Sequence, residues 1–201
     1  MPGVKAPEQE RRAQILDAAV GVAASERLDG MTVRKVADRA GLSPGLVFFH
    51  FGSKDQLLLD LLGRVLEEII GRRPPEDAAG APSARDALLT YARSELERLP
   101  GERDFVELFF DYWVVGTRNP DVRTRMSDAM AAYRASFEPL ATRIVAEEAA
   151  RFDGVPPGDV ARIIVSFVQG TAFQAVLDPD HFDVDALMAA LEALVPPPSG
   201  R

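Results

Sequence analysis

The stretch that decides the fold is Thr32-Val33-Arg34-Lys35-Val36-Ala37-Asp38-Arg39-Ala40-Gly41-Leu42-Ser43-Pro44-Gly45-Leu46-Val47-Phe48-Phe49-His50. Its first half is amphipathic, with apolar residues at helical spacing after the N-cap residue Thr32, and Gly41 ends this short helix. Two signals then predict the start of a second short helix. Ser43 is a favourable N-cap residue, and Pro44 at the first helical position already has helical φ. Two short helices joined by a glycine-containing turn predict a helix-turn-helix, a motif typical of DNA-binding proteins.

The second helix of such a motif places its N-terminal turn in the major groove. Here that turn carries Pro44, Gly45 and Leu46, which permit close approach but offer few hydrogen bonds to bases. Phe49 is suited to contact a thymine methyl group, and His50 and Lys54 lie where phosphates are expected. On the first helix, Arg34, Lys35 and Arg39 are predicted to face phosphates. The alternative to DNA contact is that these basic residues form a solvated face and that His50 is only a partly buried hydrogen-bonding residue.

The charge of this stretch contrasts with the rest of the chain. The 201 residues carry a net charge of −8. Residues 1–55 contain eight bases and seven acids, whereas residues 56–201 contain 15 bases and 24 acids. Between residues 32 and 54, Asp38 is the only acid against four bases. We therefore expect phosphates to bind this small electropositive zone and not the acidic remainder.

Helical periodicity extends through almost the whole chain, and no credible period-two alternation occurs, so the sequence predicts an all-α protein. Ser53-Lys54-Asp55-Gln56 predicts a capping box, in which the Ser53 hydroxyl and the Gln56 side chain each satisfy a backbone N–H. Pro139 is expected to kink one long helix over residues 120–152. The predicted organisation is a helix-turn-helix domain at 1–53, a connecting helix at 54–70, a linker at 71–82, a helical-bundle domain at 83–195 and a disordered tail at 196–201.

The run from Thr32 to Leu58 closely resembles the N-terminal DNA-binding domain of the TetR/AcrR family of bacterial transcriptional regulators. A weaker match extends back to Arg12-Ile15-Leu16-Ala18-Ala19. The resemblance implies that the DNA backbone is contacted by Thr32, Arg34, Phe48, Phe49, His50 and Lys54. With the residues argued above, the predicted DNA-binding set is Thr32, Arg34, Lys35, Ser43, Pro44, Gly45, Leu46, Phe48, Phe49, His50 and Lys54. Phe48 departs from the family pattern, where tyrosine is usual, and it has no hydroxyl to donate to a phosphate.

The second domain is rich in aromatic residues. Most are expected to be ordinary core, but seven are placed so that they could line a cavity: Phe105, Phe109, Tyr112, Trp113, Tyr133, Phe137 and Phe167. In the family this domain usually binds a small effector. The C-terminal residues Gln169-Gly170-Thr171-Ala172-Phe173 and Leu177-Asp178-Pro179 are similar to the branch that includes the betaine-pathway repressor.

The last two helices, over residues 159–177 and 184–194, are predicted to form a homodimer interface of four helices. The expected interface residues are Phe167, Gly170, Phe173, Leu177, Leu187, Met188 and Leu191. Burial of these helices within one chain is the alternative. Two elements at the chain end have few remaining partners within one subunit, which favours the dimer.

The remaining composition narrows the function. The chain has no cysteine and only two histidines, and it shows no catalytic or nucleotide-binding motif, so no metal, cofactor or enzymatic activity is expected. Neither a signal peptide nor a membrane span is expected, which points to the cytoplasm. The hypothesis is a ligand-responsive transcriptional regulator, a repressor that releases a palindromic operator when an effector binds. The alternatives are an all-helical enzyme or ligand carrier that uses the aromatic cavity, and a structural adaptor, which would need no basic zone.

Overall fold

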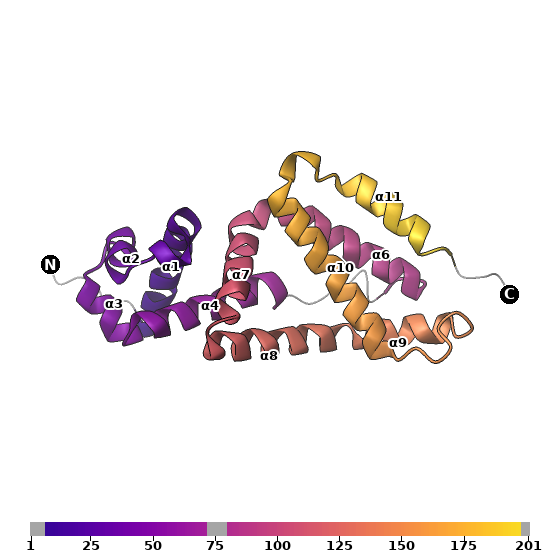
Figure 1. Ribbon diagram of the computed structural model, residues 1–201, viewed down its shortest axis with the longest axis horizontal. Helices are drawn as coiled ribbons and strands as arrows, with labels where there is room; N and C mark the ends of the chain where they lie inside the picture. Colours follow the sequence, from indigo (N-terminus) through magenta and orange to yellow (C-terminus); the bar gives the residue numbers. More distant parts are fainter. Residues whose placement is uncertain (1–6, 72–79, 198–201) are drawn as a thin grey trace. The chain divides into compact units, whose positions relative to one another are not determined.

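The computed structural model describes residues 7–71 and 80–197, and every regular element within these ranges is a helix (Figure 1). The all-α prediction is confirmed. Most of the predicted linker and residues 198–201 of the predicted tail lie outside the described residues. The chain divides into two compact units, of which the first comprises Met1–Ile69 and Glu107–Met126 and the second comprises Ile70–Val106 and Ser127–Arg201.

The first unit is built on four helices, α1 (Glu8–Gly30), α2 (Val33–Ala40), α3 (Pro44–Phe51) and α4 (Lys54–Ile70). Their apolar faces meet in one core, to which each helix contributes fully buried side chains: Ile15 and Ala19, Val36 and Ala37, Val47, and Leu57 and Leu61. Removal of such side chains from water is the main stabilising contribution. Because both helices of the helix-turn-helix take part, the core fixes their mutual orientation.

The caps that begin and end the short helices are local to the sequence. The Thr32 hydroxyl accepts a hydrogen bond from the Lys35 amide at 3.2 Å, and the Ser43 hydroxyl accepts one from Leu46 at 3.2 Å. Gly41 ends α2 with φ of +68°, a conformation that suits glycine. The predicted capping box at α4 is half wrong. Ser53 caps the Gln56 amide, but the Gln56 side chain donates to Asp60 instead.

The first unit also contains α7 (Arg103–Gly116) from Glu107 onward and α8 (Pro120–Ser136) as far as Met126. The Tyr112 hydroxyl donates to the Leu58 carbonyl at 2.7 Å, which fixes α7 to α4. Arg27 pairs with Glu107 at 3.0 Å and with Asp111 at 2.5 Å. These contacts explain why the observed units differ from the predicted domains, which place all of residues 83–195 together.

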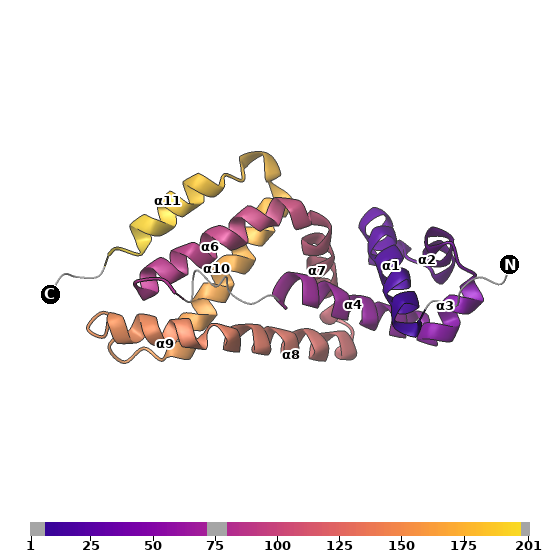
Figure 2. The same cartoon turned by 180° about the vertical axis from the view of Figure 1, so that it is seen from behind.

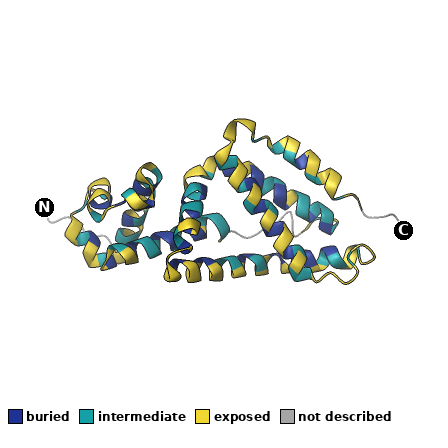
Figure 3. Ribbon diagram, in the orientation of Figure 1, coloured by how far each residue is buried: buried dark blue, intermediate teal, exposed yellow. Residues whose placement is uncertain are grey.

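The second unit packs α6 (Ala84–Arg98), α9 (Glu138–Glu147), α10 (Pro157–Leu177) and α11 (Val184–Leu194) with the end of α8. Figures 1 and 2 show α11 lying along α6. The buried core between α6, α8, α9 and α10 includes Tyr91, Tyr133, Phe137, Ala141 and Val165, and Figure 3 shows the buried faces of these helices in dark blue. The predicted kinked helix over 120–152 is in fact two helices that meet at Phe137, because Pro139 has no N–H for the turn before it.

Among the described helices, α10 alone is long and apolar enough to cross a membrane by length and composition. The sequence led us to expect no such helix. One face of α10 nevertheless packs into the core of the second unit through Ala161, Ile164, Val165 and Val168. The opposite face leaves Ile163, Phe173 and Leu177 exposed. This pattern is typical of a core helix with one uncovered side.

Candidate nucleic-acid interface

One side chain, Arg12 of α1, fixes the position of α3. Its guanidinium donates to the carbonyl of His50 at the end of α3 and to the carboxylate of Asp60 on α4. It also lies 4.4 Å from the centre of the Phe51 ring. Three helices therefore meet at a single planar group with several donors. Arg12 belongs to the family match in the sequence, but this role could not be predicted from it, because its partners are 38 and 48 residues away.

The outward face of α3 carries the residues predicted to reach bases. Val47 and Phe51 are buried, so the opposite side of this helix faces away from the core. Pro44 and Gly45 at its N-terminal turn are exposed. Phe49 is 80% exposed and Phe48 is 49% exposed. An exposed aromatic ring beside a small-residue turn provides an apolar contact surface with little steric obstruction.

The three predicted phosphate-facing cations of α2 are placed differently from one another. The Arg34 side chain is 86% exposed, and its contact with Asp38 is 4.0 Å long. Lys35 instead donates to Glu26 at 2.6 Å and to the Gly30 carbonyl at 3.2 Å. Arg39 lies against α1, where a Cβ added to Gly21 would stand 2.4 Å from its guanidinium. Of the three, Lys35 is the one held by a close carboxylate, while Arg34 has only the 4.0 Å contact and no ion pair of Arg39 occurs within the described residues.

The remaining predicted contacts lie at helix starts and at the end of α3. The Thr32 and Ser43 hydroxyls accept backbone hydrogen bonds as caps, which leaves each O–H available as a donor. Lys54 opens α4, and no ion pair of Lys54 occurs within the described residues. The His50 ring meets Phe49 edge-on at 5.2 Å, and its Nδ1 is buried with no hydrogen-bond partner in the described ranges.

The seven aromatic residues predicted to line a ligand cavity are divided between the two units. Phe109, Tyr112 and Trp113 lie in the first unit, and Phe105, Tyr133, Phe137 and Phe167 lie in the second. Tyr112 and Phe137 are fully buried in their own cores, and the Tyr133 hydroxyl is hydrogen-bonded to that of Tyr91 at 2.8 Å. Their role in ligand binding stays a prediction.

The residues predicted to form the dimer interface differ in exposure. On α10, Gly170, Phe173 and Leu177 are exposed. Phe167 on α10 and two residues of α11, Leu187 and Leu191, are half-buried. Met188 is only 2% exposed on the helix that packs against α6. Met188 is therefore buried within its own chain, as the alternative to a dimer contact predicts. The surface available to a second copy lies mainly on α10.

Two family models match this chain. Residues 15–61 match the model described as bacterial regulatory proteins, tetR family, and residues 82–196 match the model of the BetI-type transcriptional repressor, C-terminal. The chain belongs to the TetR family. This TetR-family transcriptional regulator has a BetI-type C-terminal region, in agreement with the similarity noted at residues 169–173 and 177–179.

Individual relatives and solved structures agree with this assignment. HTH-type transcriptional regulator BetI 1 of Chromohalobacter salexigens is 24% identical to this TetR-family regulator over 179 residues, 87% of this chain and 83% of the relative. A putative transcriptional regulator of Pseudomonas aeruginosa PAO1 has the same fold with a TM-score of 0.75, 19% identity and coverage of 95% of this chain and 91% of the other. A putative regulator of Saccharomonospora viridis in complex with choline gives a TM-score of 0.72, 22% identity and coverage of 93% and 96%.

Proposed function

We propose that this TetR-family regulator acts in the cytoplasm as a homodimeric repressor, which binds a palindromic operator through α3 of each copy and releases it when a small effector binds. The observation that carries the proposal is the way α3 is presented. Arg12 and the buried residues Val47 and Phe51 hold the helix from behind, while its N-terminal turn and Phe49 are exposed. A rigidly held helix with an unobstructed outer face is what reading of the major groove requires.

The expected contacts divide into those that position the protein and those that read bases. Arg34 and Lys54 lie on either side of α3 in the sequence and carry the positive charge that phosphates attract. Phe49 contacts a thymine methyl group, and Pro44 and Gly45 allow the backbone to approach the groove closely. Phe48 packs without the hydrogen bond that a tyrosine would donate.

A dimer gives the two-fold symmetry that a palindromic site needs. The exposed residues of α10, including Phe173 and Leu177, provide an apolar surface for a second copy. Two recognition helices that enter successive major grooves must lie roughly 34–36 Å apart. The interface of an obligate dimer is expected to bury at least roughly 2,000 Å².

The proposal is tested by selecting bound sequences from random duplexes and measuring affinity for the selected site and for random DNA by fluorescence anisotropy. Lys54→Ala should weaken binding to both and lower the salt slope by roughly one per lost phosphate contact, whereas Lys54→Arg should retain most of the affinity. Phe49→Ala should relax preference at one base pair per half-site by about 1–3 kcal/mol or less, and Phe49→Leu by less. Failure of the unaltered protein to bind any duplex would refute the proposed function.

A further inference from the structure

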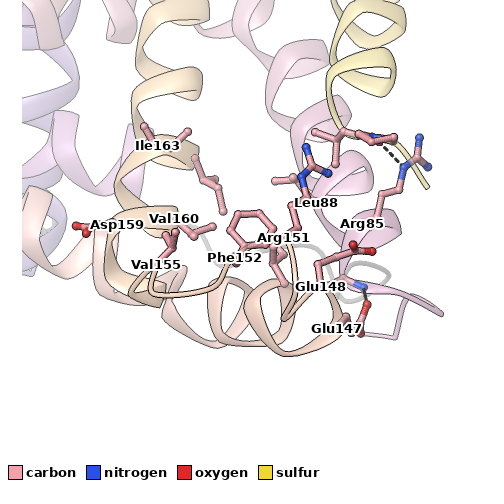
Figure 4. Close-up of a pocket in the computed structure, with 15 residues that line it drawn as sticks. Arg85, Leu88, Glu147, Glu148, Arg151, Phe152, Val155, Asp159, Val160 and Ile163 are labelled. Carbon is pink, nitrogen blue, oxygen red and sulfur yellow. Dashed lines mark hydrogen bonds between the residues drawn. The ribbon is translucent and has the colours of Figure 1, made fainter. Parts of the chain in front are cut away.

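A cleft of about 420 Å³ lies in the second unit between α6, α9, α10 and the C-terminal end of α11 (Figure 4). Its volume falls within the roughly 300–1,000 Å³ typical of small-molecule sites. The lining is mainly apolar and includes Leu88, Ile144, Phe152, Val155, Val160 and Ile163. Figure 4 shows Val155, Val160 and Ile163 on one side of the cleft and Arg85 on the other. The cleft is therefore amphipathic, with an apolar wall facing a charged edge that carries Arg85, Glu147 and Glu148.

Two arginines of the lining, Arg85 and Arg151, both donate to the end of α11. Arg85 Nε donates to the Val195 carbonyl at 2.6 Å, and Arg151 Nη2 donates to the Leu194 carbonyl at 3.5 Å. A guanidinium has five N–H donors, so most of those of Arg151 are not used by the described residues. The ion pair of Arg85 with Asp86 is 3.9 Å long, beyond hydrogen-bond distance. No ion pair of Arg151 occurs in the described ranges.

Two of the three carboxylates that line the cleft are held by partners other than Arg85 and Arg151. Glu147 accepts hydrogen bonds from the Ala84 amide and from Arg143, both at 2.7 Å, and these contacts hold the pKa of Glu147 below its usual value. Asp159 is paired with Arg162. Glu148 is then the one lining carboxylate left to face the two arginines. Counted with the partners Arg143, Arg162 and Asp86, the charges balance, and Arg151 is the lining arginine without an ion pair in the described ranges.

We propose that this cleft binds an amphipathic monoanion, with an apolar body against Phe152, Val160 and Ile163 and a single carboxylate held by Arg85 and Arg151. Arginine suits this role because its planar fork matches a carboxylate and forms charge-assisted hydrogen bonds. The inference deepens the proposed function by naming the chemical class of the effector, and it rests on that function only for the effect on DNA.

Binding of such a carboxylate would act on α11. Arg85 already donates to the carbonyls of Val195 and Glu192, so a carboxylate that takes these donors replaces contacts that hold the end of α11, whereas Arg151 has donors to spare. Because α11 carries Leu187 and Leu191 of the predicted dimer interface, a shift of its end provides a route to the spacing of the two DNA-binding helices.

The test is isothermal titration calorimetry of the full chain with three probes that share an eight-carbon tail: octanoate, 1-octanol and octylammonium. Octanoate is expected to bind about tenfold or more tightly than 1-octanol, because only its carboxylate can accept charge-assisted hydrogen bonds from the arginines. Octylammonium should bind most weakly, because it carries the same charge as the arginines. Arg151→Gln should weaken octanoate about tenfold and change 1-octanol by less than about twofold. The matched control is Arg93→Gln, since Arg93 lies on α6 outside the cleft and pairs with Asp185 and Glu97.

Three results would overturn the inference: no binding of any probe, octylammonium binding as tightly as octanoate, or Arg151→Gln behaving like Arg93→Gln. The comparison of probes on the unaltered protein needs no variant to fold. Because calorimetry is done without DNA, a protein that fails to bind any duplex refutes the proposed function while leaving the ligand result intact. A protein that binds its operator but not octanoate refutes only the inference about the cleft.

Discussion

Replacement of Arg12 by alanine should loosen α3 from the rest of the first unit. The substitution removes hydrogen bonds to the His50 carbonyl and to the Asp60 carboxylate, together with the contact over the Phe51 ring. Hydrogen bonds to charged groups contribute about 1.5–3 kcal/mol each, but the Arg12 side chain is 35% exposed and solvent screens it. Asp60 keeps its hydrogen bond from Gln56 at 2.7 Å. We therefore expect a loss of about 2–3 kcal/mol in the free energy of unfolding.

Urea denaturation followed by circular dichroism and by the fluorescence of Trp113, which lies in the same unit, measures this loss. Arg11→Ala is the matched control, because the hydrogen bond of Arg11 to Gln14 is exposed, and it should cost less than about 0.5 kcal/mol. Arg12→Lys should recover only part of the stability, since one ammonium cannot reproduce the fork geometry. Operator affinity should fall more than affinity for random DNA. Equal losses for Arg11→Ala and Arg12→Ala would refute the role assigned to Arg12.

Three further changes test local features of the structure. Gly41→Ala should cost about 1 kcal/mol or more because alanine is strained at φ of +68°, whereas Gly45→Ala, at a helical position with only the Ser43 hydroxyl 4.0 Å away, should be neutral or stabilising in thermal unfolding. Tyr91→Phe should cost about 1–3 kcal/mol by leaving the buried Tyr133 hydroxyl without its partner, and the double change to phenylalanine should cost less than the sum of the single changes. Thr32→Ala should cost about 0.5–2 kcal/mol through loss of the α2 cap, and Thr32→Ser should restore most of it.

The boundaries of the short helices could be predicted because their causes are local. Thr32, Ser43 and Gly41 act on backbone groups within four residues, so their pattern carries the same information in the sequence as in the structure. The exception at Gln56 is instructive. Its side chain could accept from the Ser53 N–H or donate to Asp60. In the structure the Ser53 N–H donates to the Phe51 carbonyl at 2.8 Å, and Gln56 donates to Asp60, which Arg12 also contacts.

The candidate site was predictable in its residues but not in their availability. The three cations of α2 lie within six residues of one another, and the sequence alone does not distinguish them. In the structure Lys35 is paired with Glu26, Arg39 lies against Gly21, and Arg34 is highly exposed with only a 4.0 Å contact to Asp38. Which cation is presented depends on how α1 docks against α2, and helical periodicity alone does not specify that docking.

By itself, the sequence determined that the chain is helical, where its short helices begin and end, and which stretch carries the helix-turn-helix. Caps, glycine conformations and apolar periodicity are interactions over a few residues, and they survive in any arrangement of the helices. Only the tertiary structure shows that Arg12 holds the end of α3, that most of α7 belongs to the first unit, and that residues from Ala84 to Pro196 line one cleft. Each of these joins groups that are tens of residues apart, so each exists only after the helices have buried their apolar faces against one another.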